Sequence, residues 1–185
     1  TAPTVTLTSV SPATVNGIFS VTATFSESVT GLVVGDITAT NGAVTNLIGG
    51  PSVYTFDITP SVTGAVNVDI SAAVTQDLTG NNNLGSNTLS RTADMTAPAV
   101  TLTSGAPATV NGTFSVTATF SESVSGLLST EVTLSNATIS NFSGSGTTYT
   151  FDVTPSVSGA VTVDVLAAVA QDSAGNNNLA SNTLS

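Results

Sequence analysis

The sequence predicts an all-β protein built from two tandem β-sandwich domains of about seven strands each. Three observations lead to this prediction. A segment of about 95 residues occurs twice without gaps, apolar and polar residues alternate with a period of two inside each copy, and turn-forming residues separate the alternating segments. The predicted domains are residues 1–93 and residues 94–185, with a linker at residues 91–97.

The two copies are closely similar over their whole length. Thr1 corresponds to Thr96 and Tyr54 to Tyr149, and the same spacing holds throughout, with roughly two thirds of the aligned positions identical. Copies at constant spacing indicate tandem duplication. A period of this length corresponds to a whole domain rather than to one layer of a solenoid. We therefore expect the same fold twice.

The alternation locates the strands of the first copy. In chain order, the predicted strands are residues 5–7, 19–25, 37–40, 54–58, 66–70 and 86–92. Turn signals lie between them, among them Asn16-Gly17, Asn41-Gly42 and the segments 60–64 and 80–83. Short strands at this density are typical of the immunoglobulin-like sandwich, although Cys and Trp, which form the core of antibody domains, are absent.

Composition excludes several classes of function. Eleven acidic residues face a single basic residue, Arg91, which gives a net charge of -10. Such a chain is repelled by phosphate backbones and anionic lipid surfaces, so we expect neither nucleic-acid binding nor membrane insertion. Because Cys, His, Lys and Trp are all absent, the sequence offers no thiolate or imidazole zinc site and no Ser–His–Asp or Cys–His catalysis. We predict that the protein is not an enzyme.

A set of motifs carries a family resemblance. They are Phe-Ser-Glu-x-Val-x-Gly at 25–31, Asp-Ile-Thr at 36–38, Tyr-Thr-Phe-x-x-x-Pro at 54–60, Gly-x-Val-x-Val at 64–68 and Gln-Asp-x-x-Gly-Asn at 76–81. In combination, the chain resembles the bacterial Ig-like repeats of large surface adhesins. The resemblance implies a secreted or cell-surface location and a monomeric stalk that contacts neighbouring repeats of the same chain. It also implies that Ca²⁺ stiffens the junctions between domains.

Strand direction predicts that acidic side chains gather at one end of each sandwich. Each strand reverses the direction of the one before it, so the loop after the second strand and the loop between the last two strands return to the same end. The acidic residues of these loops and of the linker are Glu27, Asp36, Asp77, Asp94, Glu122, Glu131 and Asp172. Because Ca²⁺ binds six to eight oxygen ligands, we predict that they form calcium sites, better formed in the second copy, which the linker precedes. The alternative is that they are solvated loop acids that shape turns.

Three other functions compete with the structural one. A calcium-dependent glycan-binding module would also gather acidic residues, but it would normally expose Trp or Tyr. A glycoside hydrolase needs two carboxylates in a cleft, and the Tyr and Phe residues that could stack on a sugar fall mostly on the apolar face of their strands. Ice binding is suggested by the Thr-x-Thr pattern at residues 4–8 and 22–24. We predict a structural extender, with the glycan-binding module as the alternative.

Overall fold

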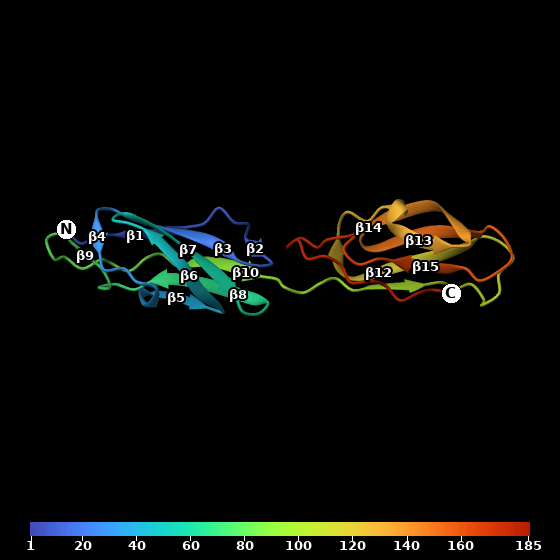
Figure 1. The fold of residues 1–185 in the computed structure, drawn as a ribbon, viewed down its shortest axis with the longest axis horizontal. Coiled ribbons are helices and arrows are strands. Elements are labelled where there is room, and N and C mark those ends of the chain that lie inside the picture. The colour runs from blue at the N-terminus through green and yellow to red at the C-terminus, as the bar shows by residue number, and fades with distance from the viewer. The chain divides into compact units, whose positions relative to one another are not determined.

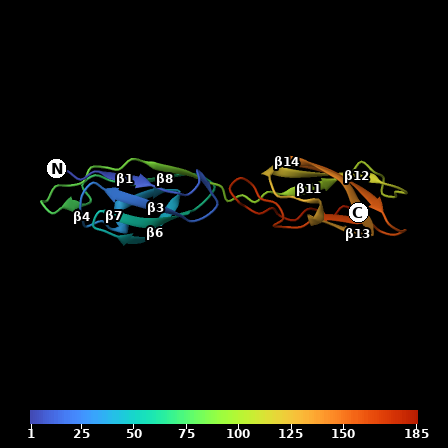
Figure 2. The ribbon, with the colours of Figure 1, turned by 90° about the horizontal axis from the view of Figure 1, so that it is seen from above.

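The computed structural model describes all 185 residues, which fold into two compact units, Thr1–Met95 and Thr96–Ser185. Each unit is a sandwich of β-strands (Figures 1 and 2). The only helical elements of the chain are two 3₁₀ turns, η1 (Val34–Asp36) in the first unit and η2 (Ser129–Glu131) in the second. No helix is of a length and hydropathy that would let it cross a bilayer. The prediction of an all-β fold is confirmed.

Seven strands form the body of the first domain. They are β1 (Val5–Thr8), β3 (Phe19–Phe25), β5 (Ile37–Thr40), β6 (Gly42–Gly49), β7 (Val53–Pro60), β8 (Gly64–Ile70) and β10 (Leu89–Ala93). One sheet has the order β1-β3-β7-β6, and the other has the order β2-β10-β8-β5, with the short β2 (Thr14–Val15) at its edge. Apart from β2, this is the ABED and GFC arrangement of a constant-type immunoglobulin domain.

The core of the first domain follows from the period-two pattern. Successive side chains of a strand point to opposite faces of the sheet. In β3, Phe19, Val21, Ala23 and Phe25 are therefore buried, while the intervening residues are exposed or half-buried. Phe56 of β7 packs among them from the neighbouring strand. Burial of these side chains is the main stabilising contribution, at about 1.5–3 kcal/mol for each large one.

Of the seven main strands, the sequence pattern misses one and begins another too early. β6 begins after Asn41, which takes a left-handed φ of 56°. None of its side chains is fully buried, so it has no clear alternation to detect. The last strand is predicted at 86–92 and observed as β10 at Leu89–Ala93. The side chain of Asn87 accepts a hydrogen bond from the N–H of Leu7 at 2.8 Å and donates one to its carbonyl at 3.1 Å, so Asn87 precedes the strand instead of belonging to it.

The second domain repeats the architecture with a core of its own. Its strands are β11 (Val100–Thr103), β12 (Phe114–Val124), β13 (Val132–Ser135), β14 (Ala137–Pro155) and β15 (Thr162–Val165). The first, second and fourth of these form one sheet, and the other two form the facing sheet. The buried cluster around Phe151 and Val163 contains no residue of the first domain. Each domain is therefore held together by its own core.

Two short pairings bring distant loops together at one end of each domain. In the first domain, β4 (Val29–Thr30) pairs with β9 (Gln76–Asp77), with Val29 opposite Asp77. In the second domain, Ser125 and Gln171 form the equivalent bridge. The loop after the second main strand thus lies beside the loop between the last two, as the strand directions predict. We call this end the acidic end of each domain.

Candidate metal centre

The loop at the acidic end of the first domain is built around Asp77. One carboxylate oxygen, Oδ1, accepts hydrogen bonds from the N–H and hydroxyl of Thr79 at 2.8 and 2.9 Å and from the N–H of Asn81 at 2.9 Å. The other oxygen accepts from the side-chain amide of Asn81 at 2.8 Å. This is the turn-shaping role that acidic residues commonly take. Four hydrogen bonds, three of them to Oδ1, therefore fix the carboxylate of Asp77 within its own loop.

The equivalent Asp172 is held by the same kind of loop. Its Oδ1 accepts from the N–H groups of Ala174 and Asn176, both at 2.8 Å, and its Oδ2 accepts from the side-chain amide of Asn176 at 2.8 Å. Ala174 replaces the Thr79 of the first copy and has no hydroxyl to donate. Asp172 therefore lacks the hydroxyl donor that Asp77 has, while the N–H of Gly175 adds to the hydrogen bonding that lowers the pKa of Asp172.

Both carboxylates are held in the charged form. Hydrogen bonds, first of all that from the Asn81 side chain, lower the pKa of Asp77 far below its usual range. For Asp172, burial is the largest influence and raises the pKa, but the hydrogen bonds led by those from Asn176 together outweigh it, so that the pKa is lowered. The two side chains are only 8% and 7% exposed. A charged, nearly buried carboxylate is a suitable ligand for a hard cation.

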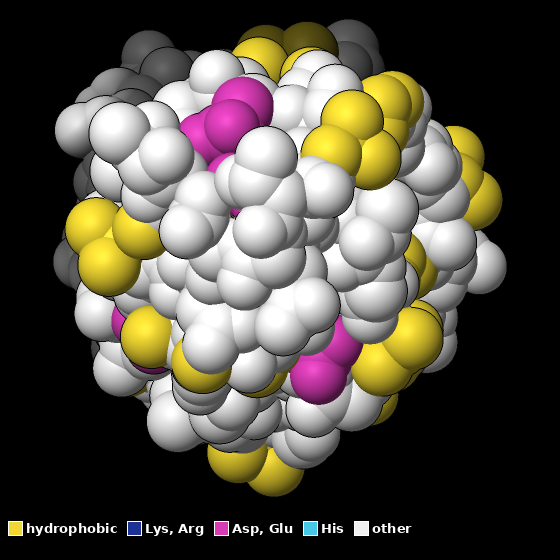
Figure 3. Space-filling model, turned by 90° about the vertical axis from the view of Figure 1, so that its left-hand side faces the viewer, with side chains coloured by type: hydrophobic (Ala, Val, Ile, Leu, Met, Phe, Trp, Pro, Cys, Tyr) yellow, Lys and Arg dark blue, Asp and Glu magenta, His cyan; other side chains and the backbone are white.

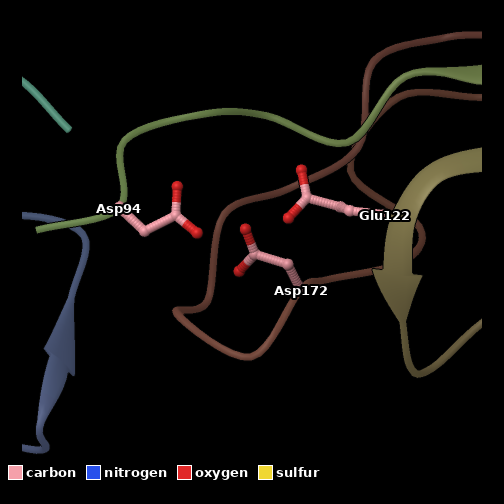
Figure 4. Close-up of side chains that lie close together, drawn as sticks. All are labelled: Asp94, Glu122 and Asp172. Carbon is pink, nitrogen blue, oxygen red and sulfur yellow. The ribbon is translucent and has the colours of Figure 1, made fainter. Parts of the chain in front are cut away.

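Glu122 faces Asp172 in the second domain. Glu122 lies near the end of β12 and Asp172 in the loop after β15, and carboxylate oxygens of the two approach within 4.8 Å. Figure 4 shows both side chains directed toward the same space. They line a small depression of about 240 Å³, together with Ser123, Ser125 and Gln171 among others. Two carboxylates with polar neighbours form an oxygen-rich set of the kind that Ca²⁺ prefers.

Asp36 and Glu131 have a local role. The carboxylate of Asp36 accepts a hydrogen bond from the N–H of Val33 at 2.9 Å, and that of Glu131 accepts one from Leu128 at 2.8 Å. Each is the last residue of a 3₁₀ turn, and its hydrogen bond reaches the residue that precedes that turn. Neither belongs to a group of three or more acidic side chains whose oxygen atoms lie together. The strand directions bring their loops to the acidic end, but local hydrogen bonding engages their carboxylates.

The acidic end of the first domain has no such group. Glu27 is half-buried there, and neither it nor Asp77 belongs to a group of three or more acidic side chains. Figure 3, which looks onto this end, shows a few separated acidic side chains on a largely uncharged surface and no basic one.

Asp94 lies in the linker. Its N–H donates to the carbonyl of Val15 at 2.8 Å, which fixes its backbone to the first domain. Only three residues separate it from Pro98, whose carbonyl accepts a hydrogen bond from Leu179 at 2.8 Å inside the second domain. The chain length alone therefore keeps Asp94 within about 15 Å of Pro98.

A buried asparagine shapes the same loop in each copy. The side-chain oxygen of Asn83 accepts from the N–H groups of Val74 and Thr75, both at 2.9 Å, and its amide donates to the carbonyls of Ser71 and Leu84 at 2.9 and 2.8 Å. Asn178 makes the equivalent four bonds. Each is only 2% exposed. The signal available in the sequence is the third Asn of Asn-Asn-Asn, repeated in both copies.

The acidic residues of the strands also have partners. Asp57 accepts from the hydroxyl of Ser20 at 2.6 Å and from the side-chain amide of Asn46 at 2.9 Å, and these bonds, that from Asn46 foremost, lower its pKa. Asn46 has a left-handed φ of 55° and lies at an irregularity of β6. Asp152 bonds Ser115 and Asn141 in the same way. We therefore assign these carboxylates to stabilising the irregular part of a strand and not to binding a ligand.

Comparison with known proteins identifies the family. No curated protein matches the chain, whereas 116 chains of solved structures do. One is the crystal structure of invasin, described as a bacterial integrin-binding protein. It is 14% identical, with a TM-score of 0.36, and the match covers 90% of this chain but only 36% of invasin. The model of the bacterial Ig-like domain matches twice, at residues 1–93 and 94–185. The chain therefore belongs to the bacterial Ig-like domain family and carries two consecutive copies of that domain.

Proposed function

We propose that the chain is a non-catalytic spacer of a bacterial cell-surface protein. The observation that carries the proposal is the duplication of a self-contained domain: two similar sequences, each with its own core. Copies of a stable domain in series lengthen a stalk without needing a contact surface for a ligand. The test is mechanical stretching of single chains, in which each domain is expected to unfold in a separate step.

The side-chain chemistry favours this proposal over catalysis or glycan binding. A general acid needs a pKa raised toward neutral, whereas the hydrogen bonds to Asp77 and Asp172 lower theirs. Glycan-binding modules commonly present aromatic rings to the sugar. Here Tyr54 and Tyr149 pack edge-on against Phe25 and Phe120, and no aromatic residue is among the exposed large hydrophobic side chains.

The proposal extends to calcium at the acidic end of the second domain. Glu122 and Asp172 would supply two carboxylate ligands, and the hydroxyl and carbonyl oxygens of the neighbouring loop residues could supply others. Bound there, Ca²⁺ would neutralise the repulsion between the two carboxylates.

Asp94 is the proposed third carboxylate ligand. Its distance along the chain from Pro98 allows it to reach the loop of Asp172, which is joined to Pro98 through the N–H of Leu179. A cation bound by both the linker and the second domain would restrict the motion of the linker. We propose that calcium stiffens the chain in this way.

Titration with Ca²⁺ tests the metal proposal. We expect binding to the second domain with a Kd between about 10⁻⁴ and 10⁻³ M, the range of extracellular calcium modules. At ten times the Kd, the stabilisation is then about 1.4 kcal/mol. Nuclear magnetic resonance should show shifts for the amides of residues 122–125 and 171–176. Asp94→Asn should weaken binding, and Glu122→Gln should abolish it.

The matched control is Asp164→Asn. Asp164 is an acidic residue of the same domain, on β15, where it accepts a hydrogen bond from Thr183 and does not line the depression of Glu122 and Asp172. This variant should bind Ca²⁺ as the parent chain does. Equal shifts in the parent chain and in Glu122→Gln, or no shift at 10 mM Ca²⁺, would contradict the metal proposal and leave the spacer proposal standing.

A further inference from the structure

The chain contains three Asn-Gly pairs, which are Asn16-Gly17, Asn41-Gly42 and Asn111-Gly112. An asparagine that precedes glycine can lose its side-chain amide without an enzyme, because glycine has no Cβ to shield the backbone nitrogen that attacks the side chain. By sequence, the three pairs are equivalent turn signals. The structure distinguishes them, because it holds one pair by hydrogen bonds and leaves the other two open.

The reaction needs only water as a co-reactant. The backbone nitrogen of the glycine gives up its proton to hydroxide and attacks Cγ of the asparagine side chain. A bond forms between these two atoms, the bond from Cγ to the side-chain nitrogen breaks, and that nitrogen takes up a proton and leaves as ammonia. Water then opens the cyclic imide at either of its carbonyls, which yields aspartate or isoaspartate. The asparagine side chain must therefore be able to rotate onto the next backbone nitrogen.

Both reacting groups are held at Asn41-Gly42. The side-chain amide of Asn41 donates to the carbonyl of Val62 at 2.9 Å, and its side-chain oxygen accepts from the N–H of Val62 at 3.2 Å. The backbone carbonyl of Asn41, which shares a peptide group with the Gly42 nitrogen, accepts from Ser61 at 3.1 Å. A Cβ on Gly42 would lie 3.0 Å from the side chain of Ile58. Attack would therefore require breaking two hydrogen bonds in a closely packed place.

Asn16-Gly17 has none of these restraints. Asn16 is exposed, and the structure gives no hydrogen bond to its side chain or to the N–H of Gly17. A Cβ on Gly17 would meet no atom within 4 Å, so the peptide is not packed against a neighbour. The second copy repeats the arrangement, with Asn111 exposed and open space around Gly112.

Asn16 also lies beside the start of the linker. The short β2 runs parallel to β10, with Val15 opposite Ala93, and the carbonyl of Val15 accepts the N–H of Asp94 at 2.8 Å. Continuing this register by one residue places Asn16 opposite Asp94. Like charges directly opposite each other on paired strands are destabilising. A carboxylate at position 16 would therefore weaken the attachment of Asp94 to the first domain.

We propose that Asn16 and Asn111 are sites of spontaneous deamidation, whereas the fold protects Asn41. The modification is the hydrolysis of a side-chain amide by water through a cyclic imide. At Asn16 it adds a negative charge opposite Asp94, and it loosens the start of the linker as the protein ages.

Ageing of the full chain in mildly alkaline buffer, well below its melting temperature, tests the proposal. Peptide mapping by mass spectrometry should find aspartate and isoaspartate forming at Asn16 and Asn111 at least about tenfold faster than at Asn41, a difference of about 1.4 kcal/mol in activation free energy. Water labelled with a heavy oxygen isotope should introduce the label at the same positions. A rate at Asn16 no higher than the rate at Asn41 overturns the proposal.

Two controls separate the effect of the fold from that of the sequence. In urea, where the bonds from Asn41 to Val62 are lost, the three pairs should react at similar rates. Gly17→Ala should slow the reaction at Asn16 and leave that at Asn111 unchanged. The alanine fits without strain, because Gly17 has no left-handed φ and its Cβ would have open space. If Asn41 stays unreactive in urea, the fold is not what protects it and the proposal fails.

The Asn16→Asp variant carries one product of the reaction and measures the effect on the linker. The amide of Asp94 should exchange its hydrogen faster in this variant than in the parent chain. The matched control is Asn16→Ser, which is polar but uncharged and should leave this exchange rate unchanged. Equal rates in the two variants would contradict the effect assigned to the charge.

Discussion

Replacing Asn83 with alanine is expected to destabilise the first domain by about 3 kcal/mol or more, because the substitution leaves two N–H groups and two carbonyls of a buried loop without their partners. For a domain of this size, that corresponds to a fall in melting temperature of about 12 °C or more. The hydrogen bonds of the Asn83 side chain lie on both sides of Ala73, which has a left-handed φ of 61°, a conformation that alanine disfavours. Calorimetry of the full chain measures the effect.

The control is the neighbouring Asn82→Ala. Asn82 is exposed and accepts one hydrogen bond, from the side chain of Gln76 at 3.0 Å, so its replacement should change stability by no more than about 0.5 kcal/mol. The second copy offers the same pair, Asn178→Ala and Asn177→Ala, as an internal replicate. Equal effects of the two substitutions within a copy would show that the buried asparagine does not hold the loop.

Acid is expected to destabilise the first domain through Asp77. Its pKa in the folded state lies below the unfolded value of about 3.9. A depressed folded pKa stabilises the domain above the unfolded pKa, and this stabilisation is lost as the pH falls below about 4. Asp77→Asn should therefore lower stability at pH 7, and its difference from the parent chain should shrink toward pH 2. Urea unfolding at several pH values measures this.

A double-mutant cycle identifies the bonds responsible. Asn81→Ala removes the side-chain hydrogen bond to Asp77 and keeps that of the backbone N–H, so the effects of Asp77→Asn and Asn81→Ala should not add at pH 7. The coupling between them should decrease at low pH, where the carboxyl group is protonated. A stability difference between the parent chain and Asp77→Asn that stays constant from pH 7 to pH 2 would contradict the role given to the charge.

The fold was predictable because burial in a sandwich has a simple pattern. The alternation along 19–25 is a direct consequence of one face of β3 lying against the core. β6 could not be predicted in this way, because its two faces are similarly exposed and its register is irregular between Thr45 and Ile48. That irregularity depends on Asn46 and Asp57, which are distant in sequence and meet only in the folded sheet.

The candidate site was predictable only in outline. Strand direction brings the loops of Glu122 and Asp172 to one end, and their carboxylates do face each other. It does not reveal that Asp36 and Glu131 bond within their own 3₁₀ turns. Such local hydrogen bonds depend on the backbone conformation of a few residues, which periodicity does not describe.

Stretching of single chains tests the central claim, that the protein is a series of self-contained domains, each of which resists force by itself. The predicted record shows two separate unfolding steps, each lengthening the chain by about 30 nm, as expected for about 90 residues in extended form. One step of about 60 nm, or gradual lengthening without steps, would contradict the claim.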